Sequence, residues 1–369
     1  MGSRVKPENK DGGGGGIRRG LFPWNGLEPM SEPIRILYPD VLSRDKHAVE
    51  RAVADDTVAF DIFNEKDADK IPGDVWRGVH GMVTGIGMPL GADVIARLET
   101  CKIITRLGVG YDLIDTAAAG ARGIVVCNVP DYGTNEVSDH AFALILNFTR
   151  GIALYNETFR DDPKDGWNYL VSPTTVRMSD KRFGIIGLGR MGTASAMRAK
   201  GFGMEVVAFD PFIPDGQELA LSVERVDTVE ELLATTDFVT IHTPLDDTTR
   251  NLINAKTVAA MKPGLILVNT ARGGICDLDA IYDGLKSRQL GACGLDVLPD
   301  EPADPDHKLI KAWRAQEDWI RGRFVITPHA AFYSPAGLKY LREKALLTCV
   351  NYIRDGVLKN CVNGDLVKR

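Results

Sequence analysis

Three side chains of different chemistry follow three short apolar runs in the second half of the chain. Arg272 stands in NTARGG, Glu301 in GLDVLPDEP and His329 in TPHAA. Histidine titrates near neutral pH, so it can accept or donate the hydroxyl proton when a hydride moves at a carbon that bears oxygen. A neighbouring glutamate favours the imidazolium form, and an arginine offers a fork of donors for a substrate carboxylate. Each residue alone could be structural, but the three together favour catalysis.

A glycine-rich stretch upstream indicates a dinucleotide site. GLGRMG at 187–192 lies between an apolar run and a helical stretch, and Asp210 ends the next apolar run. The first glycine allows a tight turn, the second lets a pyrophosphate approach the backbone, and the third lets the helix pack on the strand. The helix N-terminus attracts phosphate. Asp210 would bind ribose hydroxyls and repel a 2′-phosphate, so NAD is predicted rather than NADP. The alternative is an ordinary strand-to-helix turn.

A second glycine-rich turn, RLGVGYD, ends an apolar run in the first half of the chain. The backbone N–H groups of Val109 and Gly110 could form a nest for a carboxylate, and Arg106 could add positive charge. The alternative is a structural turn in which Asp112 caps the next helix, and the spacing does not separate the two.

The candidate site residues must be positioned by strands and helices. Two series in which short apolar runs alternate with helical stretches predict these strands and helices. The pattern predicts an α/β protein with two doubly wound parallel-sheet domains and an active-site cleft between them. The predicted division is a disordered leader at 1–32, a substrate domain at 33–133 and 333–369, and an NAD-binding domain at 134–332. The N-terminal leader is rich in glycine and charge, which disfavours a packed core.

The predicted strands fall into two series. The first series comprises Ile34–Tyr38, Val58–Phe63, Gly81–Ile86, Lys102–Leu107 and Ile124–Val129, and the second comprises Arg182–Gly187, Glu205–Asp210, Asp237–Thr243, Leu265–Ala271, Gly291–Val297 and Phe324–Pro328. Long helices are predicted at Asn135–Arg150 and Ala336–Asp355. The aperiodic segment Thr158–Thr175 is predicted to be an arm at a dimer contact. The segment Ala303–Arg323 could cover the cleft or pack on the surface.

Bulk properties exclude several classes of function. The net charge of −6 disfavours nucleic acid held on a basic surface, and no apolar stretch is long enough to span a membrane. The six cysteines form no CxxC pair, so neither a metal site nor a disulfide framework is indicated. A reducing, cytoplasmic location fits this cysteine usage.

The quoted motifs, in their order and spacing, resemble the D-isomer-specific 2-hydroxyacid dehydrogenases from about Ile34 to Leu366. The resemblance implies a Rossmann cofactor domain, a flavodoxin-like substrate domain and a homodimer formed through the cofactor domains. It implies that Arg272, Glu301 and His329 are catalytic. It implies that a small 2-keto or 2-hydroxy acid is held by Arg106, Val109 and Gly110, and Phe332 is a further candidate for the wall of the substrate pocket. It implies that NAD is held by Gly187, Leu188, Gly189, Arg190, Met191, Asp210, Thr243, Pro244, Thr249, Thr270, Ala271 and Asp296.

Within the family, the chain looks most similar to the C-terminal binding protein branch, through RAKGFG, HAAFYS and LKNCVN. That branch carries tryptophan at the position of Phe332, so its substrate preference does not transfer. The primary hypothesis is an NAD-dependent enzyme that interconverts a D-2-hydroxy acid and a 2-keto acid, with His329 as acid and base. The alternative is an NAD(H)-sensing dimeric scaffold, similar to a corepressor, with weak dehydrogenase activity.

Overall fold

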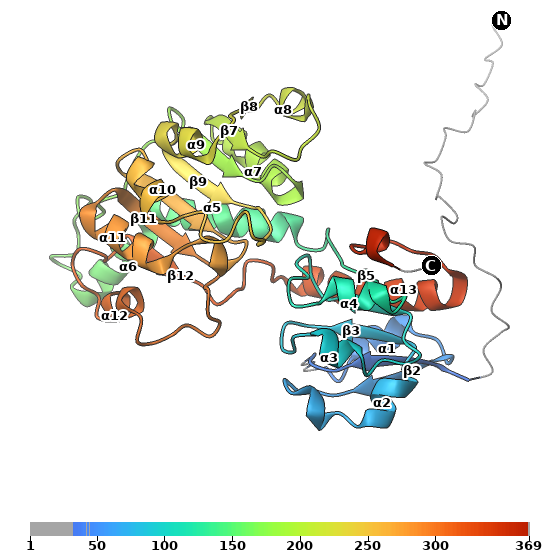
Figure 1. Cartoon of the computed structure of the whole chain (residues 1–369). Helices are drawn as coiled ribbons and strands as arrows, with labels where there is room; N and C mark the ends of the chain where they lie inside the picture. Colours follow the sequence, from blue (N-terminus) through green and yellow to red (C-terminus); the bar gives the residue numbers. More distant parts are fainter. Residues whose placement is uncertain (1–31, 42, 44, 368–369) are drawn as a thin grey trace, which may run out of the picture. The chain divides into compact units, whose positions relative to one another are not determined.

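The computed structural model describes residues 32–41, 43 and 45–367 of the chain. The predicted leader, residues 1–32, lies outside this range except for its last residue. The described chain divides into two compact units, each built on one parallel sheet (Figure 1). The first unit holds the described residues of Met1–Leu107, Leu113–Val129 and Arg342–Arg369, and the second holds Gly108–Asp112 and Pro130–Leu341. The crossing at 129/130 lies four residues before the predicted boundary at 133/134, and the crossing at 341/342 lies nine residues after the predicted boundary at 332/333.

The first unit contains a five-stranded parallel sheet in the order β2-β1-β3-β4-β5. Its strands are β1 (Ile34–Tyr38), β2 (Val58–Ile62), β3 (Gly81–Thr84), β4 (Ile103–Arg106) and β5 (Val125–Cys127). This is the flavodoxin-like order that was predicted. Each strand starts at or next to its predicted first residue, because runs of β-branched and other apolar residues form the buried strands of parallel sheets.

Helices cover both faces of the first sheet. They are α1 (Ala48–Val53), η1 (Ala68–Lys70), α2 (Gly73–Gly78), α3 (Ala92–Ile95), α4 (Thr116–Ala121), the end of α13 (Pro335–Asp355) and η3 (Gly364–Leu366). Trp76, Ile95 and Leu98 pack in the core on one face. On α13, the guanidinium of Arg342 donates to the fully buried carboxylate of Glu50, with Nε 2.8 Å from Oε1. This buried pair attaches the C-terminal helix to the first unit.

The second unit contains a seven-stranded parallel sheet in the order β12-β11-β10-β9-β6-β7-β8. Its strands are β6 (Arg182–Ile186), β7 (Glu205–Phe209), β8 (Glu224–Arg225), β9 (Phe238–Ile241), β10 (Leu265–Asn269), β11 (Leu290–Leu295) and β12 (Phe324–Ile326). The order reverses between β6 and β9, which is the switch point of a Rossmann sheet. Ligands of such sheets bind beyond the carboxyl ends of the strands at this point.

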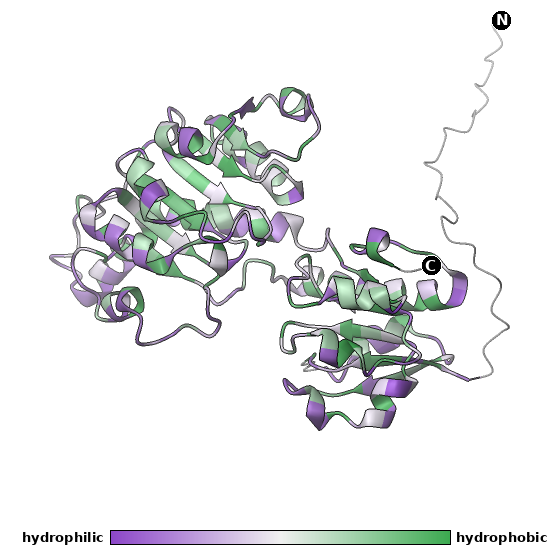
Figure 2. Cartoon of the chain, viewed as in Figure 1, coloured by the Kyte–Doolittle hydropathy of each residue, from purple (hydrophilic) through white to green (hydrophobic). Residues whose placement is uncertain are grey.

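Two apolar cores lie on the two faces of the second sheet. Helices α5 (Thr134–Arg150) and α7 (Arg190–Gly201) pack on one face, and α9 (Val229–Thr235), α10 (Ala255–Ala260) and α11 (Leu278–Ser287) pack on the other. The remaining helices of this unit are α6 (Ile152–Asp161), α8 (Gln217–Ala220), η2 (Gly273–Ile275) and α12 (Lys308–Arg314). Figure 2 shows the hydrophobic strands inside each unit and hydrophilic residues on the outer sides of the helices.

Three parts of the second unit differ from the predicted elements or extend them. The sequence predicted six strands, and the additional β8 is a two-residue edge strand without apolar residues. Helix α6 occupies the start of the predicted arm, and residues 162–181 that follow contain no helix or strand. The segment Ala303–Arg323 packs on the unit's own surface: α12 contacts α11, and the Trp319 ring lies 5.2 Å from that of Tyr282.

Among the described residues, no helix is both long and apolar enough to cross a membrane.

Candidate functional site

The glycine turn after β6 has the geometry that its sequence predicted. Gly187 has a φ of 93°, and a Cβ there would lie 2.8 Å from the backbone nitrogen of Thr243. A Cβ on Gly192 would lie 2.0 Å from the carbonyl oxygen of Gly187, so only glycine lets α7 approach β6 this closely. Nothing described lies within 4 Å of a Cβ built on Gly189, the N-cap of α7. The turn therefore leaves open space at a helix N-terminus, where a phosphate fits.

The carboxylate of Asp210 holds the end of β7 against the glycine turn. Its Oδ2 accepts a hydrogen bond of 2.8 Å from the Leu188 N–H, and its Oδ1 accepts one of 2.9 Å from the Phe212 N–H. Asp210 is partly exposed, so its carboxylate has further acceptor capacity toward solvent. Its position beside the turn is the one expected for a ribose-binding acid.

The other predicted cofactor residues follow β9 and β10 at the same edge of the sheet. The Thr249 hydroxyl donates to the Pro244 carbonyl at 2.7 Å and closes the turn after Thr243. After β10, the Ala271 N–H donates to the Asn269 side chain at 2.9 Å. The buried hydroxyl of Thr270 has no hydrogen-bond partner within the described chain. A buried polar atom without a partner is costly, so this hydroxyl is suited to bind a group that the structure does not contain. The open glycine turn and this hydroxyl fit a dinucleotide.

The structure pairs His329 with Glu301 directly. His329 Nδ1 lies 2.8 Å from Glu301 Oε2, and the Leu298 N–H donates to Oε1 at 3.1 Å. Burial raises the pKa of Glu301, but the hydrogen bond and charge of His329, the Leu298 N–H and the charge of Arg272 together outweigh it, and the net pKa is lowered. Glu301 is therefore a carboxylate at neutral pH. The His329 side chain is 28% exposed, so its second ring nitrogen, Nε2, can be reached by a ligand.

The buried carboxylate of Asp296 shapes the loop that carries His329. Its Oδ1 accepts hydrogen bonds from the Thr327 hydroxyl at 2.5 Å and the Ala330 N–H at 2.9 Å, and its Oδ2 accepts from the Ala331 N–H at 2.9 Å. The His329 N–H also donates to the Asp296 carbonyl at 2.7 Å. These bonds hold His329 at a φ of 51°, which residues other than glycine rarely adopt. Asp296 thus positions the histidine, whatever further contact it makes with a cofactor.

His140 adds a contact to this loop that the sequence analysis did not identify. This residue lies on α5, and its Nε2 is 2.9 Å from the Thr327 hydroxyl and 3.6 Å from Asp296 Oδ1. His140 and Thr327 are 187 positions apart in the sequence, so no local motif reveals this contact. The one feature of the sequence that could have indicated this contact is that His140 lies on the otherwise apolar face of the predicted helix Asn135–Arg150.

Arg272 lies against the turn Gly108–Asp112, which belongs to the same unit. Its Nε donates to Asp112 Oδ1 at 3.0 Å, and a Cβ on Gly110 would lie 1.5 Å from one guanidinium nitrogen. A side chain at Gly110 would therefore displace the guanidinium from this position. The alternative role for Asp112, as a helix cap, is wrong: Asp115 caps α4 by accepting from the Ala118 N–H at 2.8 Å. Asp112 pairs with Arg272 instead.

A close backbone contact links the loop of Arg272 to that of Glu301. A Cβ on Gly273 would lie 1.8 Å from the carbonyl carbon of Leu298, and the Leu298 N–H binds the Glu301 carboxylate. The second unit thus brings Arg272, Glu301 and His329 to one edge of its sheet, on loops that contact one another.

The other predicted substrate residues are Phe332, Val109 and Arg106, and each lies in a different part of the structure. The Phe332 ring lies 6.2 Å from that of His329 and 6.0 Å from that of Tyr132, so it is part of an aromatic cluster beside the histidine. Val109 lies in the turn that faces Arg272 and is partly buried. Arg106 ends β4 of the first unit, is 6% exposed and donates to the Leu107 carbonyl.

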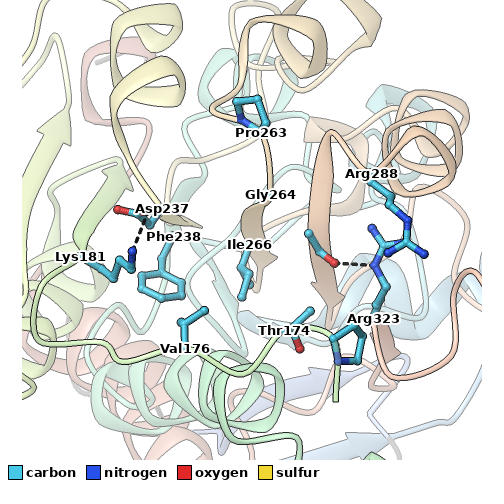
Figure 3. Close-up of a pocket in the computed structure, with 12 residues that line it drawn as sticks. Thr174, Val176, Lys181, Asp237, Phe238, Pro263, Gly264, Ile266, Arg288 and Arg323 are labelled. Carbon is cyan, nitrogen blue, oxygen red and sulfur yellow. Dashed lines mark hydrogen bonds and ion pairs between the residues drawn. The ribbon is translucent and has the colours of Figure 1, made fainter. Parts of the chain in front are cut away.

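A cavity of about 340 Å³ lies at the opposite edge of the second sheet (Figure 3). Its lining includes Lys181, Asp237, Gly264 and Arg323, at or next to the amino ends of strands. Lys181 faces Asp237, and Arg323 donates to the Gly291 carbonyl at 2.7 Å. The cavity is at the wrong end of the strands for the cofactor of a Rossmann sheet.

Comparison with known proteins agrees with this geometry. Residues 142–331 match the model of the D-isomer specific 2-hydroxyacid dehydrogenase, NAD binding domain. A glyoxylate reductase of Korarchaeum cryptofilum is 34% identical over 79% of this chain and 85% of its own length. A D-3-phosphoglycerate dehydrogenase of Methanocaldococcus jannaschii is 35% identical over 73% of this chain, which spans half of that relative's length.

A solved structure extends the likeness to nearly the whole described chain. The D-lactate dehydrogenase of Aquifex aeolicus, solved with NAD and lactic acid, has a TM-score of 0.77 at 26% identity. The match covers 89% of this chain and 99% of that one. The predicted fold and NAD as the cofactor are confirmed by these comparisons, and a dehydrogenase is favoured over the scaffold. The resemblance to the C-terminal binding protein branch stays a prediction.

Proposed function

The chain belongs to the D-isomer-specific 2-hydroxyacid dehydrogenase family, and from this premise we propose that it interconverts a D-2-hydroxy acid and a 2-keto acid. The observation that carries the proposal is the contact of 2.8 Å between His329 and Glu301, beside Arg272 and at the cofactor edge of the sheet. NAD, when bound, supplies the hydride acceptor for oxidation and, as NADH, the hydride donor for reduction.

His329 is the proposed acid and base. Its Nδ1 is occupied by the Glu301 carboxylate, so Nε2 is the atom that exchanges a proton with the substrate oxygen. In reduction, Nε2–H donates to the carbonyl oxygen of the keto acid, and in oxidation Nε2 accepts the hydroxyl proton. Glu301 stays ionised and stabilises the imidazolium that oxidation produces. The Asp296 carboxylate fixes the loop, so the ring is held in place before substrate arrives.

Arg272 is the proposed binding group for the substrate carboxylate. Its guanidinium can make two parallel hydrogen bonds to a carboxylate and can polarise the adjacent carbonyl. The backbone N–H groups of Val109 and Gly110 would add donors from the turn that the arginine contacts. Arg106 and Phe332 are proposed as the remaining substrate contacts, with Phe332 contributing an aromatic surface beside His329.

The proposed cofactor contacts are the glycine turn Gly187–Met191, Asp210 and the loops after β9, β10 and β11. Asp210 is proposed to select NAD over NADP, because its carboxylate would lie near a 2′-phosphate and repel it. Thr243, Pro244, Thr249, Thr270, Ala271 and Asp296 complete the set. The Thr270 hydroxyl, which has no hydrogen-bond partner within the described chain, supports this assignment.

The direct test is NADH oxidation by the purified protein with a panel of 2-keto acids, from glyoxylate and pyruvate to bulky and dicarboxylic acids. NADPH serves as the parallel cofactor control. We expect rapid turnover with one size class of keto acid and a preference for NADH. Tight NADH binding without turnover of any panel member would contradict the proposal and favour a sensing scaffold.

A homodimer is also proposed, and its support is an exposed apolar surface after α6. Trp167, Tyr169 and Leu170 are 82%, 83% and 75% exposed. Clusters of large exposed apolar side chains mark interfaces more often than solvent-facing surface. Light scattering should give about twice the chain mass of 40.3 kDa. Replacing Trp167 and Tyr169 by aspartate should shift the mass to the monomer, whereas Phe212→Asp, at an equally exposed aromatic residue, should not.

A cytoplasmic location is proposed from the cysteines. All six are free thiols, and five of them are buried, which is typical of proteins of a reducing compartment. Fractionation of cells with an antibody to the chain would test it, and recovery in the membrane or secreted fraction would contradict it.

A further inference from the structure

Two cysteines of the first unit face each other across a short antiparallel pairing. Cys127 ends the edge strand β5, and Cys361 lies in the segment that follows α13. The two residues form an isolated antiparallel bridge. The Asn128 N–H donates to the Asn360 carbonyl at 3.2 Å, and the Val362 N–H donates to the Val126 carbonyl at 2.8 Å.

This bond pattern makes the cysteines a non-hydrogen-bonded pair. The neighbours of each cysteine exchange the backbone hydrogen bonds, while the cysteines themselves sit directly opposite each other. Such pairs have Cα atoms about 4.5 Å apart and side chains on the same side of the ribbon. Disulfides span Cα separations of roughly 4.4–6.8 Å, so the backbone can accept a bond between these two sulfurs without moving far.

We propose that Cys127 and Cys361 are a reversible dithiol–disulfide site, oxidised by hydrogen peroxide or a similar small peroxide. In the disulfide form, the C-terminal segment is covalently attached to β5.

The thiols of Cys361 and Cys127 differ in exposure and in pKa, and this difference assigns each its part in the reaction. Cys361 is partly exposed, and its hydrogen bond with Cys127 lowers its pKa to about 7, although burial opposes this effect. The same contact, together with burial, raises the pKa of Cys127. Cys361 is therefore the attacking thiolate, and Cys127 is the neighbouring thiol that resolves the product.

The oxidation balances in two steps. The Cys361 thiolate attacks one oxygen of the peroxide, the O–O bond breaks, and Cys361 becomes a sulfenic acid while hydroxide leaves. The Cys127 sulfur then attacks the Cys361 sulfur, and the S–S bond forms as the S–O bond breaks. The proton of Cys127 and the departing hydroxide form water. Both sulfurs are oxidised, one peroxide is reduced, and an added dithiol reverses the reaction.

The other nearby cysteine is directed elsewhere. Cys349, on α13, is fully buried, and its sulfur contacts the Thr105 hydroxyl at 3.1 Å and the Met82 carbonyl at 3.4 Å. Burial raises the pKa of its thiol to about 12. Cys349 is thus neither reactive nor aimed at Cys127 and provides a matched control.

The C-terminal segment is already held in register by one side chain. Asn363 Oδ1 accepts from the Val126 N–H at 2.8 Å, and its Nδ2 donates to the Ile124 and Thr116 carbonyls at 3.1 Å and 3.2 Å. A Cβ on Gly120 of α4 would lie 2.6 Å from the Leu366 carbonyl oxygen, so η3 packs closely on that helix. The reduced protein therefore presents the pair preformed, and the disulfide adds a covalent constraint to an existing contact.

The test is a tryptic peptide map of the full-length folded protein after brief treatment with hydrogen peroxide and alkylation of free thiols. Cleavage would place Cys127 in peptide 123–150 and Cys361 in peptide 360–368. We expect these two peptides to run as one cross-linked species, about 2 Da lighter than their sum, that dithiothreitol separates. The melting temperature of the oxidised protein should rise by roughly 5–10 °C, because the cross-link constrains the unfolded chain.

The variants make the result specific. Cys361→Ser should remove the cross-linked species and leave Cys127 available to alkylation after unfolding, whereas Cys349→Ala should retain the cross-link. A sulfinic acid on Cys361 without any cross-link would overturn the proposal. A disulfide between another pair, or six alkylated cysteines after peroxide, would overturn it as well.

Discussion

The two edges of the seven-stranded sheet both carry charged side chains, yet only one edge is suited to bind a ligand. At the amino edge, Arg323 is 3% exposed and donates to the carbonyls of Leu285, Leu290, Gly291 and Trp319. At the carboxyl edge, the Thr270 hydroxyl has no partner in the described chain, and the space above Gly189 is open. Charge alone therefore does not mark a site. The carboxyl edge differs in that it combines open space beside a helix N-terminus with a buried hydroxyl that the described chain leaves unsatisfied.

The first prediction concerns the loss of His329, the proposed proton donor at the carboxyl edge of the sheet. His329→Gln should lower kcat for NADH-dependent reduction by ~10²–10⁴, because glutamine cannot transfer a proton at Nε2. NADH affinity, followed by fluorescence, should be retained. His307→Gln is the matched control, because His307 caps α12 on the surface segment, and its kcat should equal that of the wild type. Near wild-type turnover of His329→Gln would refute the assigned role.

The second prediction concerns the loss of Arg323, the buried cation at the amino edge of the seven-stranded sheet. Arg323→Met should destabilise the protein by about 3 kcal/mol, because it removes the buried guanidinium donor from four carbonyls. Urea denaturation would measure the loss, and kcat should be unchanged under conditions where the variant is folded. Arg321→Met breaks only an exposed ion pair with Asp161 and should cost less than about 1 kcal/mol. An equal decrease in the free energy of unfolding for the two variants would show that the buried hydrogen bonds of Arg323 stabilise the protein no more than an exposed ion pair does.

The third prediction concerns cofactor choice at the carboxyl edge. Asp210→Asn keeps an oxygen that can accept from the Leu188 N–H but removes the charge that would repel a 2′-phosphate. The ratio of kcat/KM for NADPH to that for NADH should rise by roughly tenfold, since like charges in contact are strongly unfavourable. Asp215→Asn, at an exposed aspartate paired with Arg225, should leave the ratio unchanged. An unchanged ratio in Asp210→Asn would contradict the ribose role.

The fourth prediction is a smaller effect of pH on stability. His242 follows β9 beneath the glycine turn, and burial lowers its pKa to about 3. The folded state keeps this histidine neutral, while the unfolded chain takes up a proton below about pH 6.5. The contribution of His242 to stability is therefore complete above pH 6.5 and decreases as the pH falls toward 3. The free energy of unfolding should drop by about 1 kcal/mol between pH 6.5 and pH 5.5 from this group alone. No change over that interval would contradict the buried neutral state.

The sequence predicted most of the fold because apolar runs and helical periods specify local structure directly. It missed β8, whose residues Glu224 and Arg225 have no apolar pattern, and it missed α6, which begins directly after a left-handed Gly151. Arg272, Glu301 and His329 could be predicted as a set because all three follow strands of one sheet. The contacts between Arg272 and Asp112, 160 residues apart, and between His140 and Thr327 were not, because they depend on how loops and helices pack.

The most direct test of the central claim is the steady-state reduction of keto acids by Glu301→Gln, measured beside wild type and His329→Gln. The Glu301 carboxylate lies 2.8 Å from His329 Nδ1 and orients the ring whose Nε2 delivers the proton to the keto acid. We expect Glu301→Gln to lower kcat by roughly 10² while NADH affinity, followed by fluorescence, is retained. The double variant should be no slower than His329→Gln alone, because the two side chains act as one unit. Wild-type turnover of Glu301→Gln would contradict this role.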